Sequence, residues 1–223
     1  RRNQPSQSIK VSGFMARLRK DRTIANLSEG YERLKELVRA DAKASDVAEL
    51  LADLTSKALR FLSSCKQTPL VSKVHGKRYF SFTIKGTDKL SRAVNKELFH
   101  PNIRGQLSHL VEGTLINLAS ADRSRLLYTI AIAYCCASDL LKTRDQKTPA
   151  TFFECLIGHL FARAFSVNPR TQVEVLHLED EASTLPTDFI FDLGPGKSKF
   201  HVPVKTSTRE RVIQVFAHQR VLD

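Results

Sequence analysis

The last third of the chain constrains the fold most, because its helical and strand-like segments follow one another in a fixed order. Thr148-Pro149 opens an apolar helix that is predicted to end before Asn168-Pro169. Three strand-like runs and a closing amphipathic helix follow, at residues 172–178, 188–193, 200–205 and from about 209 onward. Helix, three strands and helix in this order predict an α+β unit in which helices flank a sheet.

The second and third strand-like runs are separated by a turn signal, Gly194-Pro195-Gly196-Lys197. They are therefore expected to form an antiparallel hairpin. If its loop centres between residues 196 and 197, Asp188 faces Lys205 and Asp192 faces His201. Directly opposed residues have Cβ atoms roughly 5 Å apart. A carboxylate beside a lysine can hold a divalent cation and activate water against a phosphodiester, although a plain cross-strand ion pair would look the same.

The segment Lys205-Thr206-Ser207-Thr208-Arg209-Glu210-Arg211 joins the third strand to the closing helix. A lysine at a strand end can serve phosphate chemistry, while two guanidiniums at a helix start can reach bases in a major groove. The same residues could also form a charged corner with Ser/Thr caps. The segment alone does not decide between these two readings.

Glu154 lies inside the apolar helix that precedes the strands. Ile157, Phe161 and Ala164 follow it at helical spacing, so its carboxylate is expected at the border of the core-facing side. A carboxylate there is costly unless it is paired or bound to a metal. His159 is expected to point elsewhere, as a hydrogen-bonded helix histidine.

The charge balance favours a polyanionic partner. The chain of 223 residues has a net charge of +12 and 42% hydrophobic residues, with a sequence pI near 9.8. Each phosphate neutralised by Lys or Arg releases a counterion and adds affinity. No apolar run predicts a membrane span, and the N-terminus lacks the apolar core of a signal peptide. Four cysteines without a C-x-x-C spacing indicate free thiols and a cytoplasmic protein.

The first two-thirds of the chain is predicted to be mostly helical. Expected helices cover about residues 27–39, 45–64, 88–99, 106–119 and 122–142, with a short strand at 79–84. We therefore expect a helical region at 1–145, for dimerisation or DNA contacts, and a second unit at 146–223. Because an α/β sheet would need another strand after the closing helix, further residues are expected beyond Asp223.

The helix with Glu154, the strand with Pro186-Thr187-Asp188 and the strand ending in Val204-Lys205 together resemble the PD-(D/E)xK nuclease core. The tail from Lys205 to Arg211 is similar to the K-(S/T)-x-x-R-(D/E)-R pattern of type II restriction endonucleases that cut CCGG, CCNGG or CCWGG-type sites. The resemblance covers about 75 residues, from Thr148 to Asp223. It implies a nuclease core with a mixed central sheet flanked by helices, and it does not extend to the helical region that precedes this core.

The resemblance also implies a role for each matching residue. Asp188 would be the metal-ligating carboxylate, Lys205 the lysine near the scissile phosphate, and Glu154 a helix carboxylate that supports the metal or the lysine. The base-reading residues would be Arg209, Glu210 and Arg211. The arginines would donate to guanine O6 and N7, and the glutamate would accept from cytosine N4, in agreement with the general base-edge code.

The sequence departs from the family pattern at the second acid. The position two before the lysine is Pro203, and the positions in the following helix where CCGG-cutting relatives carry the acid are His218 and Gln219. Either the site works with the remaining ligands or the chain carries an inactivating change. Glu174 on the first strand could supply another ligand.

The function implied is that of a Mg²⁺-dependent type II restriction endonuclease from a prokaryotic restriction-modification system. It would cut double-stranded DNA at a palindromic C:G-containing site, as a homodimer or higher oligomer because two symmetric half-sites need two active sites. Basic clusters at residues 17–22 and 73–78 would then touch phosphates, or simply be solvated surface. The alternatives are a non-catalytic DNA-binding protein and a nuclease without sequence preference.

Overall fold

The protein is an α+β structure, as expected from its sequence. The described strands form two small antiparallel sheets, not the single mixed central sheet that was expected. The computed structural model describes residues 7–40, 42–73, 75–141, 147–174 and 184–204. The elements along the chain are α1 Gln7–Arg39, α2 Ala44–Leu62, β1 Lys66–Leu70, β2 Tyr79–Thr83, β3 Val94–Asn95, η1 Arg104–Gln106, α3 Ser108–Glu112, η2 Leu115–Asn117, α4 Ser120–Leu141, α5 Lys147–Phe165, β4 Arg170–Glu174, β5 Thr184–Asp192 and β6 Lys199–Val202.

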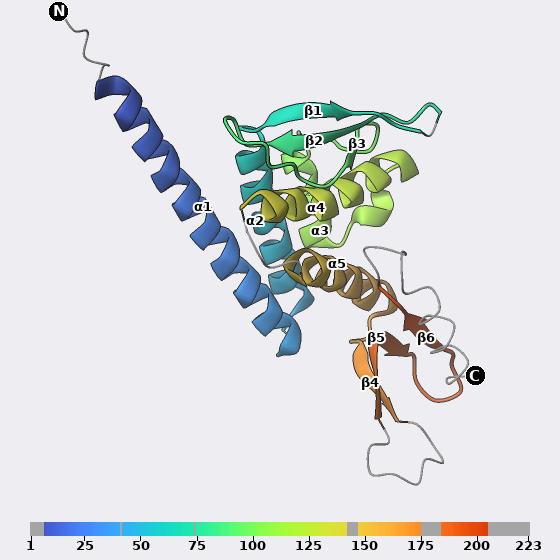
Figure 1. Ribbon diagram of the computed structural model, residues 1–223. Helices are drawn as coiled ribbons and strands as arrows, with labels where there is room; N and C mark the ends of the chain where they lie inside the picture. Colours follow the sequence, from blue (N-terminus) through green and yellow to red (C-terminus); the bar gives the residue numbers. More distant parts are fainter. Residues whose placement is uncertain (1–6, 41, 74, 142–146, 175–183, 205–223) are drawn as a thin grey trace, which may run out of the picture.

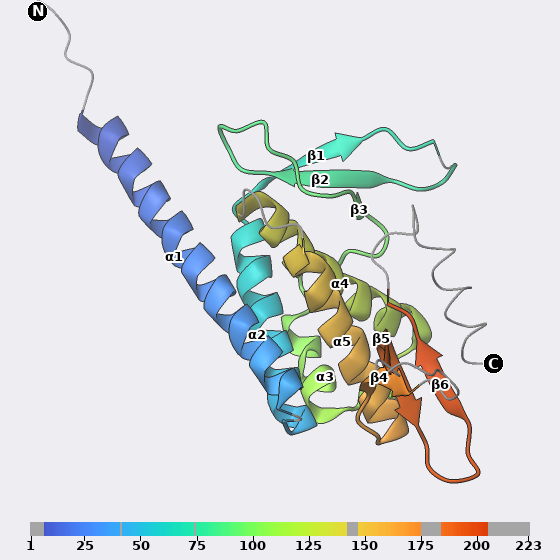
Figure 2. The same ribbon diagram turned by 60° about the horizontal axis from the view of Figure 1, so that its bottom comes forward.

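The two sheets lie at different ends of a helical body (Figures 1 and 2). Sheet A has the order β1-β2-β3, and sheet B has the order β4-β5-β6. Every ladder in the described residues is antiparallel. Helix α1 projects from the body on the side away from sheet B. Sheet B is therefore reached from a side of the molecule that α1 leaves open.

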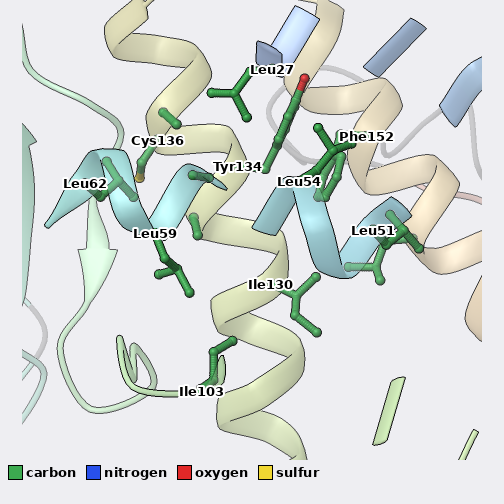
Figure 3. Packing of buried hydrophobic residues seen from close by; sticks show 14 of the residues in the cluster. Leu27, Leu51, Leu54, Leu59, Leu62, Ile103, Ile130, Tyr134, Cys136 and Phe152 are labelled. Carbon is green, nitrogen blue, oxygen red and sulfur yellow. The ribbon is translucent and has the colours of Figure 1, made fainter. Parts of the chain in front are cut away.

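The main hydrophobic core joins α1, α2, α4 and α5 (Figure 3). Tyr134 of α4 stacks on Phe152 of α5 with ring centroids 4.0 Å apart and an interplanar angle of 17°. Around this pair, Leu51 and Leu54 of α2 and Ile130 of α4 are fully buried. Their periodic spacing along α2 and α4 is what the sequence pattern of these two helices predicted.

Helix α4 is long and apolar enough, by length and composition alone, to cross a membrane, and within the described part of the chain it alone meets that test. In the fold, 61% of its most apolar window is buried inside the protein. A helix wrapped by other helices and a sheet occupies the position of a core helix, as its sequence predicted.

Helix α5 has two apolar sides that belong to two separate clusters. Phe152, Cys155 and Leu156 complete the main core. The opposite side packs on sheet B, where Phe189, Phe191 and Val204 form a second cluster with five residues of α5, namely Phe153, Ile157, Phe161, Ala162 and Phe165. Helix α5 thus holds sheet B against the helical body.

Helix α1 begins twenty residues before its predicted start at Leu27. Gly30 lies inside this helix. A Cβ at this position would come 2.7 Å from Leu54 Cδ2, so the glycine permits close packing of α1 on α2. This packing requirement explains a glycine in a helix interior, where it is otherwise unfavourable.

The helix predicted over residues 88–99 is wrong, because long-range contacts hold this segment extended. Ser91 exchanges hydrogen bonds with Phe82, its amide donating to the Phe82 carbonyl and its hydroxyl accepting from the Phe82 amide, both at 2.9 Å. Arg92 forms a bidentate pair with Asp139 of α4, at 2.8 and 2.9 Å. The segment contributes β3 and a bridge between Thr83 and Leu90 instead. Tertiary partners override the local helical pattern here.

The helix predicted over residues 106–119 is broken into η1, α3 and η2. Helix α3 ends at Gly113, which has a φ of 75° and is therefore left-handed. The Arg163 guanidinium packs beside Gly113 and donates to the carbonyls of Leu110 and Val111 at 3.1 and 2.9 Å. Arg163 thereby supplies the hydrogen bonds that the end of α3 lacks.

His159 lies on the core side of α5 and is only 6% exposed. Its Nε2 has no hydrogen-bond partner among the described residues, so the expectation of a hydrogen-bonded histidine is not met at that atom. The ring borders a cavity of about 110 Å³ between α1, α2, α5 and β5, which is large enough to hold water. Burial, together with the nearby positive charge of Arg163, lowers the pKa of His159 to about 4.

This low pKa predicts a loss of stability in mild acid. The unfolded chain takes up a proton near the ordinary pKa of 6.5, whereas folded His159 stays neutral down to about 4. The stability that depends on neutral His159 is therefore fully present above pH 6.5 and is lost as pH falls. The free energy of unfolding should decrease by about 2 kcal/mol between about pH 7 and about pH 5. The free energy of unfolding in urea, measured at the two pH values, should differ less for His159→Leu than for the parent protein. The exposed His75→Gln should keep the parent's difference, and an unchanged difference in His159→Leu would contradict the assignment.

Candidate functional site

Helix α5 carries Glu154 toward sheet B. Glu154, Ile157, Phe161 and Phe165 are spaced three or four residues apart, so they lie on one side of the helix. The last three of these pack in the cluster with Phe189 and Phe191 of β5. Gly158 lies on the same side, and a Cβ there would come 2.8 Å from the ring of Phe189. The half-buried Glu154 therefore lies one turn before Gly158, where α5 packs tightly on Phe189 of β5.

The hairpin between β5 and β6 forms as predicted, but its register differs by two residues. Lys197 N–H donates to the Gly194 carbonyl at 3.1 Å, with Pro195 and Gly196 between them. Gly196 has a φ of 70°, so proline and a left-handed glycine occupy the positions they favour in a type II turn. The turn thus centres between 195 and 196, and Ile190 pairs with His201.

The predicted pairing of Asp192 with His201 is therefore wrong. Asp192 is opposite Lys199, and its Oδ2 is 3.4 Å from the Lys199 ammonium. Its Oδ1 accepts a hydrogen bond from Gly194 N–H at 3.0 Å. That backbone hydrogen bond first, and Lys199 second, hold the pKa of Asp192 below its usual value. Asp192 stabilises the hairpin turn, which is a structural task.

Asp188 lies where the β5–β6 ladder ends. The last paired residue on β6 is Val202, and Pro203 has no N–H to continue the ladder. The next amide, Val204 N–H, donates instead to Asp188 Oδ2 at 2.8 Å. The predicted direct pairing of Asp188 with Lys205 is replaced by this contact one residue earlier. Lys205 itself lies outside the described residues.

Strand alternation separates the two faces of sheet B. Phe189 and Phe191 face α5, so Asp188 and Ile190 lie on the opposite face. Glu154 approaches from the α5 side. A site that uses both Asp188 and Glu154 would therefore have to lie at the end of the sheet, where Pro203 stops the ladder.

Several predicted site residues fall outside the part of the chain that can be described. These are Lys205, Arg209, Glu210, Arg211, His218 and Gln219. The backbone of Glu174 pairs with Thr184 at the end of β4, while its side chain lies outside the described set. The sequence pattern alone does not identify the Val204 amide as a partner of Asp188. The signal that could have pointed to it is Pro203, which has no N–H and therefore interrupts the strand.

Asp188 and Glu154 offer carboxylate oxygens, which are the ligands that Mg²⁺ prefers. Among the described residues, no group of three or more His, Cys, Asp or Glu side chains gathers closely enough to hold a metal. The donor chemistry of these two carboxylates fits magnesium, and any third protein ligand must come from elsewhere in the chain. The four cysteines are free thiols, as expected. Burial raises the pKa of the Cys155 thiol to about 11.

The Asp188–Val204 hydrogen bond predicts a difference between two substitutions. Asp188→Asn keeps a side-chain oxygen that can accept from the Val204 amide, whereas Asp188→Ala removes it. We expect Asp188→Ala to lower the free energy of unfolding by about 1 kcal/mol and Asp188→Asn to change it by less than about half of that. Urea denaturation of the two variants measures this difference. Equal losses would show that the hydrogen bond does not hold the strand end.

No protein-family model matches the chain, and no curated protein matches it either. A solved structure does: the type IIP restriction endonuclease Kpn2I superposes with a TM-score of 0.67 over 88% of this chain and 70% of its own, at 22% sequence identity. Because it covers 88% of this chain, the likeness extends beyond residues 148–223 into the helical region, to which the sequence resemblance did not reach. Most of the chain thus shares its fold with this restriction endonuclease.

Proposed function

We propose that the protein is a Mg²⁺-dependent type II restriction endonuclease that cuts double-stranded DNA at a palindromic, C:G-containing site. The observation that carries the proposal is the contact between Asp188 and the Val204 amide. It holds a carboxylate beside the residue that precedes Lys205, at the end of a strand pair. The fold shared with Kpn2I supports the same reading.

Asp188 and Glu154 would hold the magnesium ion, which when bound supplies positive charge to the phosphate and lowers the pKa of water. The Lys205 ammonium would neutralise charge that develops on the scissile phosphate. Water attacks phosphorus in line and the bond to the 3′ oxygen breaks. The products are a 5′-phosphate and a 3′-hydroxyl.

Arg209, Glu210 and Arg211 would read C:G pairs in the major groove. Guanine presents two acceptors, O6 and N7, which match the paired donors of a guanidinium, and cytosine presents an N4 donor to a carboxylate. These residues follow Lys205 after a short spacer. Base reading would thus take place close along the chain to the lysine at the cleaved phosphate.

The palindromic site requires two copies of this arrangement, so the active form would be a homodimer or higher oligomer. The boundary between the two units would lie at about residue 145. The helical region would serve dimerisation or DNA contacts, and the unit with sheet B would carry the nuclease site. Because α5 packs on both, each copy would present its site on a rigid support.

Cleavage of plasmid DNA with Mg²⁺ tests the catalytic part. We expect discrete fragments from the parent protein and none from Asp188→Asn or Lys205→Ala, while both variants still shift the mobility of DNA. Asp188→Asn preserves the partner of Val204, so its loss of cutting would reflect the charge and not the fold. Lys199→Ala is the matched control, because Lys199 is an exposed lysine in a weak surface pair. Equal cutting by Lys205→Ala would contradict its role.

Base reading is tested separately with Arg209→Ala. Removal of one bidentate contact to guanine should cost about 1–3 kcal/mol of specific binding. Titration of a cleavable duplex and of an unrelated duplex should show the loss only for the former. A parent protein that shifts plasmid without cutting it would instead be a DNA-binding protein, and a smear of products would indicate a nuclease without sequence preference.

A further inference from the structure

Sheet A carries a disproportionate share of the positive charge of the chain. Residues 66–97 contain eight Lys and Arg against two Asp and Glu, which is a net +6 out of +12 for the whole chain. We propose that the hairpin formed by β1 and β2 is a second DNA-binding element that grips the phosphate backbone outside the recognition site. This inference rests on the proposed function, since it assumes a duplex bound at the sheet B site.

Some of the cations in this region are already paired within the protein. Arg92 is bound by Asp139, Arg78 by Glu97 at 2.8 Å, and the Lys89 ammonium donates to the Leu140 carbonyl at 3.2 Å. These three side chains hold sheet A together and onto α4. They are structural and are not the proposed contacts.

The cations at the hairpin tip are different. Lys73 and Lys77 are exposed, and no ion pair within the described residues neutralises either of them. The exposed His75 lies between them. Gly76, with a φ of 72° and open space around it, turns the chain at the tip. Two exposed lysines that form no ion pair in the described part of the chain give a local positive potential that a polyanion would neutralise.

The tip is carried on a well-anchored support. Phe80 and Phe82 of β2 pack edge to face on each other with ring centroids 5.1 Å apart, and both contact Phe99. Five residue pairs join β1 to β2, and the hydroxyls of Thr68 and Thr83 lie 3.1 Å apart across them. The hairpin is thus fixed to the core at its base and presents its basic end to solvent.

The position of the tip favours a duplex over another anionic partner. Figures 1 and 2 both show the β1–β2 tip on the same side of the helices as sheet B, away from the side on which α1 projects. A linear polyanion bound at the end of sheet B can extend past this side of the body. Lysine contacts to phosphate are independent of sequence, so the hairpin would add affinity without changing the recognised site.

The test uses the full chain and the double variant Lys73→Ala/Lys77→Ala. Its affinity for a fluorescent duplex of arbitrary sequence is measured by anisotropy between about 50 and about 200 mM salt. Loss of two phosphate contacts should make the negative slope of log K against log salt shallower by about 2. Lys73→Arg/Lys77→Arg should retain the parent slope. The control Arg33→Ala/Lys43→Ala removes two exposed charges at the α1–α2 corner and should leave the slope unchanged.

An unchanged slope in Lys73→Ala/Lys77→Ala would overturn the proposal, as would an equal drop in the Arg33→Ala/Lys43→Ala control, which would indicate net charge alone. Binding of phosphatidylserine vesicles in place of the duplex would also overturn it. Plasmid cutting by the parent protein is scored in parallel. If cutting is seen without a hairpin effect, only this inference fails. If neither cutting nor duplex binding is seen, the proposed function fails with it.

Discussion

The fold depends on helix α5 being apolar on two sides. One side completes the main core through Phe152, which stacks on Tyr134 of α4. The other side receives Phe189 and Phe191 of β5, with Gly158 permitting the closest approach. A helix that packs on a large core with one side and on a small sheet with the other holds the sheet in place, because packed interiors deform little. Sheet B has three described strands and three buried members in its own cluster. Its geometry therefore relies on α5.

The end of sheet B is defined by a single missing donor. Pro203 stops the β5–β6 ladder, and the freed Val204 amide is taken by Asp188. Pro203 stands where a second carboxylate was expected. Because it ends the ladder, the Val204 amide is left to hold the first carboxylate, that of Asp188. In the proposed enzyme, Asp188 is oriented by the backbone immediately before Lys205. This would give the site an ordered carboxylate despite its short supply of acids.

Much of the helical framework could be predicted, because α2, α4 and α5 have long apolar patterns that match their burial. Other elements depend on distant partners that a local pattern does not reveal. The extended segment around Arg92 exists because of Asp139, which is 47 residues away. Strand β1 contains Pro69 and few apolar residues, so nothing in its sequence marked it as a strand. The hairpin register could have been found, since proline followed by glycine specifies where a type II turn centres.

In the function that we propose, Asp188 and Lys205 belong to the cleavage site of a site-specific DNA endonuclease. The most direct measurement is to sequence the ends of the products formed from a plasmid of known sequence in the presence of Mg²⁺. We expect all ends to map to one palindromic, C:G-containing sequence and to carry 5′-phosphates. Ends scattered over the plasmid, or a plasmid left intact by protein that binds it, would contradict this function.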